Sequence, residues 1–134
     1  MSGLETQTEA ELKADLETMT KEQLKGELGK ARDKILETDV SIVKLLVKRF
    51  KLCVSIAYIK YWLTKVKDNG EEMGVEDKRR ETVVYSNMES TAAGEGGFDY
   101  IPKIRVIYNA VIGGAKDLQK TIMEACERRY GRRS

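Results

Sequence analysis

Apolar or small residues recur every three or four positions between Leu24 and Leu46, which is the period of an α-helix with one buried face. No Gly or Pro interrupts residues 32–60, so this stretch predicts the middle of one long helix. From Phe50 onward, apolar residues also occupy the other faces of the predicted helix. We therefore expect its second half to be enclosed on several sides.

Capping signals place the ends of the predicted helices. Thr20 and Gln23 have the spacing of a capping box, so the long helix is expected to run from residue 20 to about Val66. A weak short helix is expected after the Thr8–Glu11 capping box, and a link is expected over residues 67–74. The next helix is expected to be opened by Asp77 and to end near Thr91, followed by a flexible loop over residues 92–97. The last helix is expected to begin at Asp99, with Pro102 in its first turn.

The pattern contains no convincing strand and no internal repeat, so the fold class it predicts is all-α. We expect a three-helix chain with one long N-terminal helix. The 134 residues suffice for one domain with a real core. The predicted organisation is an N-terminal extension with a weak short helix at 1–19, a helical domain at 20–128 and a basic tail at 129–134.

Charge and cysteine content narrow the class of protein. The 24 basic and 22 acidic residues leave a net charge of only +2, which argues against a general nucleic-acid partner. No apolar run is long enough to span a bilayer, and the first residues are polar and acidic, so we expect a cytoplasmic protein without membrane association. Cys53 and Cys126 match no paired spacing and are expected to be reduced thiols.

The residue types that are missing also limit the chemistry. The chain has no His, which excludes His-based acid–base catalysis and His-ligated zinc. Two distant Cys do not make a metal site, and the Gly-rich residues 94–97 follow no strand, as a phosphate loop would. We therefore expect no metal and no cofactor, and a site built from Arg, Lys, Glu, Asp and Gln.

Three of the cations in the predicted long helix, Arg32, Arg49 and Lys60, lie within its apolar stretch. Arg49 and Lys60 are eleven residues apart, almost three turns, so their side chains leave the same face. Arg32 points roughly a quarter turn away and lies about 25 Å down the axis from Arg49. One straight helix cannot bring Arg32 and Lys60 to one ligand, but an antiparallel copy related by a two-fold axis can. Taken singly, Arg49 is more typical of a surface ion pair and Lys60 of a snorkelling side chain.

The order of these residues carries a family resemblance. Arg32, Asp39, Arg49 and Lys60 are followed by VEDKRRE at residues 75–81 and by Gln119 in the last helix. This spacing resembles that of the all-helical (AroQ-class) chorismate mutases over residues 28–122. The resemblance implies an intertwined homodimer, in which Arg32 of one chain reaches the active site of the other.

The resemblance also implies roles on the carboxylate and ether side of chorismate. Arg49 and the partner's Arg32 would bind the two carboxylates of this substrate. Lys60 would contact the ether oxygen and a carboxylate, and Gln119 would donate a hydrogen bond to the ether oxygen. Arg forks suit carboxylates, and a Lys with a neutral amide suits an ether oxygen that gains negative charge.

On the opposite side, the resemblance matches Arg80 to a further substrate-side Arg and Glu81 to the acid that binds the substrate hydroxyl. Asp77 matches a position near the same hydroxyl. Ala115 stands where the family usually has Ser, and Gly113 and Gly114 stand where it usually has polar helix formers, which suggests a kink or a close approach there. The link over residues 61–76 is longer than in compact members of the family. Its extra residues are expected either to extend the first helix or to form a lid.

The rearrangement of chorismate to prephenate is pericyclic, so a site without His, metal or cofactor can catalyse it. Chorismate mutase activity in aromatic amino-acid synthesis is therefore the leading hypothesis. The same fold could instead act as an isochorismate-pyruvate lyase or on 4-amino-4-deoxychorismate, although Glu81 favours a C4 hydroxyl. A non-catalytic helical dimer or regulatory module is the alternative from a different class.

Overall fold

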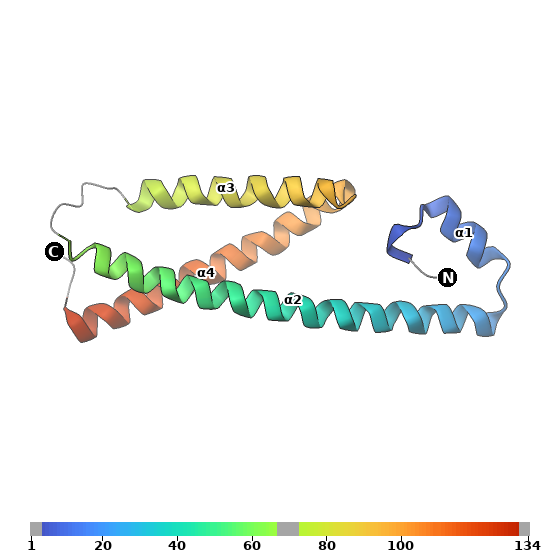
Figure 1. Cartoon of the computed structure of the whole chain (residues 1–134), viewed down its shortest axis with the longest axis horizontal. Coiled ribbons are helices and arrows are strands. Elements are labelled where there is room, and N and C mark those ends of the chain that lie inside the picture. The colour runs from blue at the N-terminus through green and yellow to red at the C-terminus, as the bar shows by residue number, and fades with distance from the viewer. Residues whose placement is uncertain (1–3, 67–72, 132–134) are drawn as a thin grey trace. The chain divides into compact units, whose positions relative to one another are not determined.

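The computed structural model describes residues 4–66 and 73–131 (Figure 1). These residues contain helices and no strand, so the all-α prediction is confirmed. The elements are, in order, the 3₁₀ turn η1 (Leu4–Thr6), α1 (Glu9–Glu17), α2 (Lys21–Leu63), α3 (Met73–Gly94), the 3₁₀ turn η2 (Phe98–Tyr100) and α4 (Ile101–Tyr130).

The start of α2 follows from the predicted capping box. The backbone N–H of Thr20 donates to Gln23 Oε1 at 2.9 Å, and the N–H of Gln23 donates to Thr20 Oγ1 at 3.2 Å. These two bonds satisfy donors that the first turn of a helix leaves unpaired. The helix ends at Leu63, and a turn continues to Val66, the residue at which the sequence predicted its end.

The predicted bounds of α3 were wrong at both ends. The helix begins at Met73, so Asp77 lies within it and does not open it. At the other end α3 continues past Thr91 to Gly94. Gly74 lies within α3, and a Gly inside a helix lowers its stability by about 1 kcal/mol, which surrounding helix formers can offset. The chain then turns at Gly96, whose φ of 75° favours glycine.

The last helix starts two residues later than predicted. Asp99 belongs to η2, and α4 begins at Ile101 with Pro102 in its first turn, as expected. The helix runs unbroken through Gly113 and Gly114 to Tyr130. A Cβ atom built on Gly114 would lie 3.6 Å from the ring of Phe50, an ordinary contact, so that glycine is not needed for a close approach.

The chain divides into two compact units, Met1–Lys48 and Arg49–Ser134. In the first, Thr8 Oγ1 accepts from the N–H of Glu11 and caps α1, as its capping box predicted. No side chain of α1 is buried. An exposed ion pair of 3.4 Å joins Glu5 to Lys34 of α2, and the Glu5 backbone N–H together with the Lys34 charge lowers the pKa of Glu5.

Deleting residues 2–18 is expected to leave the rest of the chain folded and in the same oligomeric state. The apolar side chains described in this segment, among them Leu12 and Leu16, are at most half-buried, and exposed ion pairs contribute about 0–1 kcal/mol. Circular dichroism melting and size-exclusion chromatography of both chains would measure this. A truncated chain that unfolds or changes its oligomeric state would place Leu12 and Leu16 in the core.

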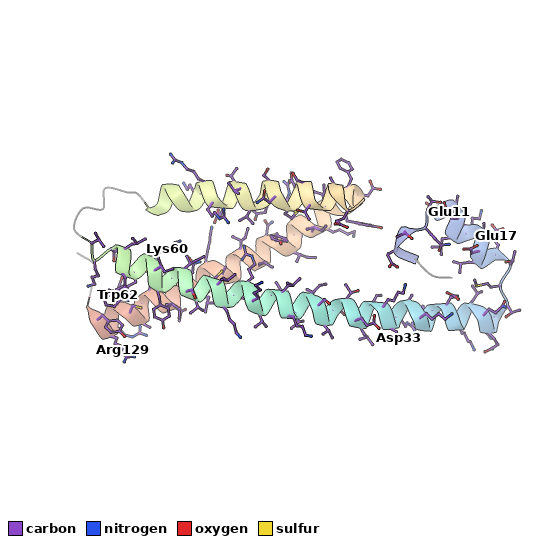
Figure 2. All side chains as sticks on the ribbon, viewed as in Figure 1. Glu11, Glu17, Asp33, Lys60, Trp62 and Arg129 are labelled. Carbon is purple, nitrogen blue, oxygen red and sulfur yellow. The ribbon has the colours of Figure 1, made fainter. Side chains whose placement is uncertain are left out.

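The core of the second unit is small and lies where α2 and α4 pack. Tyr61 is fully buried, and its hydroxyl donates to the carbonyl of Gly131 at 2.6 Å, which ties the end of α4 to α2. The ring of Trp62 lies 5.3 Å from the ring of Tyr130 at an interplanar angle of 51°, and the guanidinium of Arg129 lies over the Tyr130 ring. Figure 2 labels Trp62 on α2 and Arg129 on α4. The other buried side chains are Cys53, Ala57, Met88, Val111, Ile112, Ala115 and Cys126, and both cysteines are free thiols.

The expected burial of α2 was wrong for the single chain. In the part of α2 that precedes Arg49, Leu36 is 64% exposed and Leu45 is 65% exposed. In its C-terminal half only Cys53, Ala57 and Tyr61 are buried, so this half is not enclosed on several sides. A row of exposed apolar side chains this long is unusual for a monomer and typical of an interaction surface.

Within the described residues, no helix has enough apolar length to cross a membrane.

Candidate functional site

The second unit contains a cavity of about 450 Å³ bounded by α2, α3 and α4. Sites for small organic ligands have volumes in this range, roughly 300–1,000 Å³. The residues that line it are Arg49, Leu52, Cys53, Ile56, Lys60, Arg80, Glu81, Val84, Ile112, Ala115, Lys116 and Gln119.

Helix α2 supplies one wall of the cavity. Arg49 and Lys60 both line it, because their spacing of almost three turns places them on one face of the helix. Both side chains are half-buried. Between them, Leu52 and Ile56 present an apolar surface, and the guanidinium of Arg49 lies 3.9 Å from the sulfur of Cys53. The two cations therefore face an environment with apolar walls, where electrostatic attraction to a ligand is stronger than in water.

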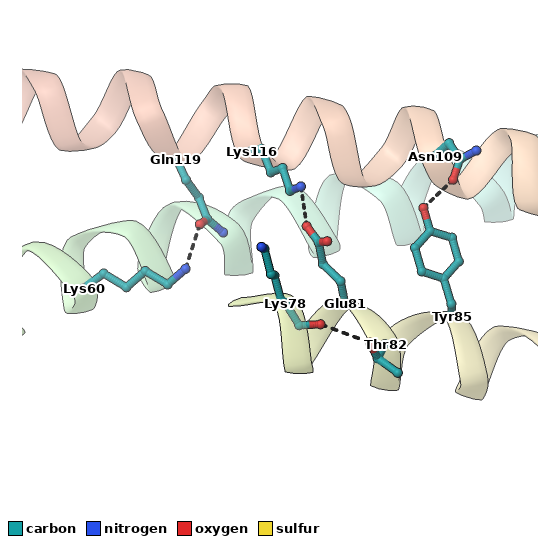
Figure 3. A network of polar contacts seen from close by, with 8 residues as sticks. All are labelled: Lys60, Lys78, Glu81, Thr82, Tyr85, Asn109, Lys116 and Gln119. Carbon is teal, nitrogen blue, oxygen red and sulfur yellow. Dashed lines mark hydrogen bonds and ion pairs between the residues drawn. The ribbon is translucent and has the colours of Figure 1, made fainter. Parts of the chain in front are cut away.

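A hydrogen bond across the cavity joins α2 to α4. Lys60 Nζ donates to Gln119 Oε1 at 3.3 Å (Figure 3). An amide has one acceptor oxygen and one NH₂ group with two donors. Because the oxygen faces Lys60, this orientation turns the Gln119 NH₂ group away from Lys60 and makes it a donor for a ligand in the cavity.

Helix α3 supplies the opposite wall. Glu81 is partly buried and forms an ion pair with Lys116 of α4 (Figure 3), and Arg80 is an exposed residue at the cavity rim. Ala115 is 7% exposed and faces the cavity from α4, where it presents a methyl group and no hydroxyl.

Two of the predicted residues are not among the described residues that line this cavity. The side chain of Asp77 is outside the described part of the chain. Arg32 is exposed and belongs to the first unit, whereas all lining residues belong to the second.

Lys116 and the apolar lining residues other than Ala115 were not predicted. Lys116 lies three residues before Gln119 and four after Ile112, so the helical period alone could have placed it near the cavity. Its ion pair with Glu81 depends on how α3 packs against α4, which no local sequence signal gives.

The charges of the lining residues define the kind of ligand. Among the described residues, four cationic side chains and one carboxylate line the cavity, an excess of three positive charges. Two guanidinium groups can bind carboxylates in pairs of parallel hydrogen bonds. The fold and the site together define an all-helical protein with a cavity whose charge suits a small organic anion with more than one negative charge.

Comparison with protein families narrows this class further. The family model for chorismate mutase type II matches residues 31–126. The match covers most of the chain, and the chain belongs to the chorismate mutase type II family. Family membership supports chorismate mutase activity, an isomerisation, and does not favour the lyase, amino-substrate or non-catalytic alternatives. Comparisons with curated proteins and with solved structures gave no match.

Proposed function

We propose that the cavity binds chorismate and catalyses its rearrangement to prephenate, an intramolecular transfer on the route to phenylalanine and tyrosine. The observation that carries this proposal is the trio of Arg49, Lys60 and Gln119, which line one cavity with apolar walls and of which two are hydrogen-bonded together. The substrate is a dianion, and its charge complements the excess of positive charge in the cavity. A cytoplasmic location stays a prediction.

The reaction breaks the ether C–O bond of chorismate and forms a C–C bond within the same molecule. It needs no nucleophile, proton transfer or electron acceptor, so the side chains only hold a compact reactive conformer and stabilise developing charge. Arg49 binds a carboxylate, which is fully charged throughout the reaction. Lys60 and Gln119 donate to the ether oxygen, which gains negative charge only as its bond breaks.

The α3 wall binds the other side of the substrate. Glu81 accepts a hydrogen bond from the C4 hydroxyl, and Arg80 at the rim adds a positive charge on the substrate side. Asp77 acts near the same hydroxyl. Ala115 contributes a small apolar surface in place of the Ser hydroxyl that the family resemblance implies at this position.

A second copy of the chain completes the site. Arg32 supplies the second carboxylate contact from the partner, and the antiparallel pairing covers the apolar side chains that α2 exposes in one chain. Ile35 at 59% and Leu45 at 65% exposure support such a partner, because burial of apolar area drives stable homodimers.

Turnover of chorismate by the purified chain tests the proposed function. Loss of chorismate and appearance of prephenate, without added metal or cofactor, is the expected result. Isochorismate serves as the comparison substrate, since pyruvate release from it would indicate lyase activity. A folded chain that turns over neither substrate would favour the non-catalytic alternative.

Changing Gln119→Glu is expected to make the activity dependent on pH. The introduced carboxyl donates a hydrogen bond only when protonated, and the ammonium of Lys60 at this position holds its pKa low. Activity should therefore be low at neutral pH and rise as the pH falls toward 5. Profiles of kcat between pH 5 and 8 would measure this.

The unmodified chain and Gln119→Ala are the controls for that measurement. The unmodified chain has no His, so its kcat should vary little over this range. Gln119→Ala removes the donor at every pH and should give a low, flat profile. Full activity of Gln119→Glu at neutral pH, with no slope, would contradict a donor role toward the ether oxygen.

A further inference from the structure

Lys116 reaches across the cavity from α4 and pairs with Glu81 of α3 (Figure 3). Both residues line the cavity, as do Ala115 next to Lys116 and Gln119 one turn further along α4. The roles carried over from the family resemblance include no residue at position 116. The structure thus adds a fourth cation to the three that the family pattern gives this cavity, Arg49, Lys60 and Arg80.

The burial of the two partners differs in a way that matters for a ligand. The side chain of Glu81 is 31% exposed, whereas that of Lys116 is 63% exposed. An ion pair between two fully exposed side chains contributes little to the stability of a protein. Here the carboxylate belongs to the cavity wall, and it is the one acidic side chain among the described residues that line this cavity. Lys116 therefore acts on the acceptor that a ligand would meet.

We propose that Lys116 determines substrate specificity by selecting a neutral hydroxyl, and excluding an ammonium group, at the substrate position that Glu81 contacts. The inference rests on the proposed function and extends it to a choice between two substrates of the same skeleton. These are chorismate, with its C4 hydroxyl, and 4-amino-4-deoxychorismate, which bears an ammonium group at C4.

The chemistry of a paired carboxylate explains this selection. A carboxylate has about four acceptor positions, so Glu81 accepts a hydrogen bond from a hydroxyl while it remains paired with Lys116. The same pairing fixes the orientation of the carboxylate. An ammonium group placed against Glu81 would lie next to the ammonium of Lys116, and like charges in close contact repel. Specificity then arises from a repulsive element against the wrong substrate.

The test compares Lys116→Met with the unmodified chain on both substrates. Removing the charge should raise kcat/KM for the amino substrate relative to chorismate by about tenfold, because the repulsion is lost. The KM for chorismate should rise several-fold as Glu81 loses its orienting partner, with kcat changed less. If neither chain turns over the amino compound, its inhibition constant against chorismate gives the same comparison and should fall by about tenfold.

Two variants provide the controls. Lys116→Arg keeps the charge and should keep the preference for the hydroxyl. Lys103→Met removes one exposed positive charge from α4 outside the cavity lining and should leave the ratio unchanged. A Lys116→Met chain that turns over chorismate with an unchanged ratio would overturn this inference alone. An unmodified chain that does not turn over chorismate would instead overturn the proposed function, and the inference with it.

Discussion

Replacing Lys60 with alanine is expected to lower kcat for chorismate by about a hundredfold to a thousandfold. The ammonium of Lys60 lies against apolar walls and is hydrogen-bonded to Gln119 on the facing helix, so it is held in place before the reaction starts. A preorganised donor aimed at a developing negative charge stabilises the transition state more than the ground state. KM should therefore change much less than kcat, which steady-state kinetics would measure directly.

Two further variants show whether that loss is specific. Lys51→Ala removes an exposed cation from the same helix, outside the cavity lining, and should retain activity. Arg49→Ala should raise KM, because its carboxylate partner is already charged in the bound substrate. It should also lower kcat, because Arg49 helps to hold the reactive conformer. A Lys60→Ala chain that folds and turns over chorismate at the normal rate would remove the proposed mechanism.

Local signals predicted those parts of the structure that depend on neighbouring residues in the chain. The Thr20–Gln23 capping box fixed the start of α2, since both of its hydrogen bonds form within four residues. Helical periodicity likewise placed Arg49 and Lys60 on one face, and both line one cavity. The sequence predicted a link over residues 67–74, whereas α3 begins at Met73 and continues through Gly74, although Gly is a poor helix former.

The remaining features depend on contacts between distant segments. The ion pair of Lys116 with Glu81 requires the packing of α4 against α3, and neither residue has a spacing that reveals the other. The apolar pattern of α2 predicted burial that the single chain does not show, because a pattern cannot say whether a covering surface comes from the same chain. The exposed Leu36 and Leu45 show that the described chain does not cover it.

Mixing an Arg32→Ala chain with a Lys60→Ala chain is expected to restore activity that neither variant has alone. In the proposed homodimer, each site takes Lys60 from one chain and Arg32 from the other. A heterodimer of the two variants then has one site with both residues intact and one site with neither. Random exchange makes half of all dimers heterodimers, so about a quarter of the sites should regain full activity.

A matched mixture tests whether the recovery comes from sharing between chains. Lys60 and Gln119 are hydrogen-bonded within one chain, so a heterodimer of Lys60→Ala with Gln119→Ala has no intact site and should stay inactive. Mass spectrometry of differently tagged chains would confirm that subunits have exchanged in both mixtures. If exchange is complete and the Arg32→Ala mixture is as inactive as the Gln119→Ala mixture, Arg32 does not act in the partner's site. Recovery in the first mixture alone would require Arg32 to cross between chains, because no other pairing of these variants rebuilds a complete site.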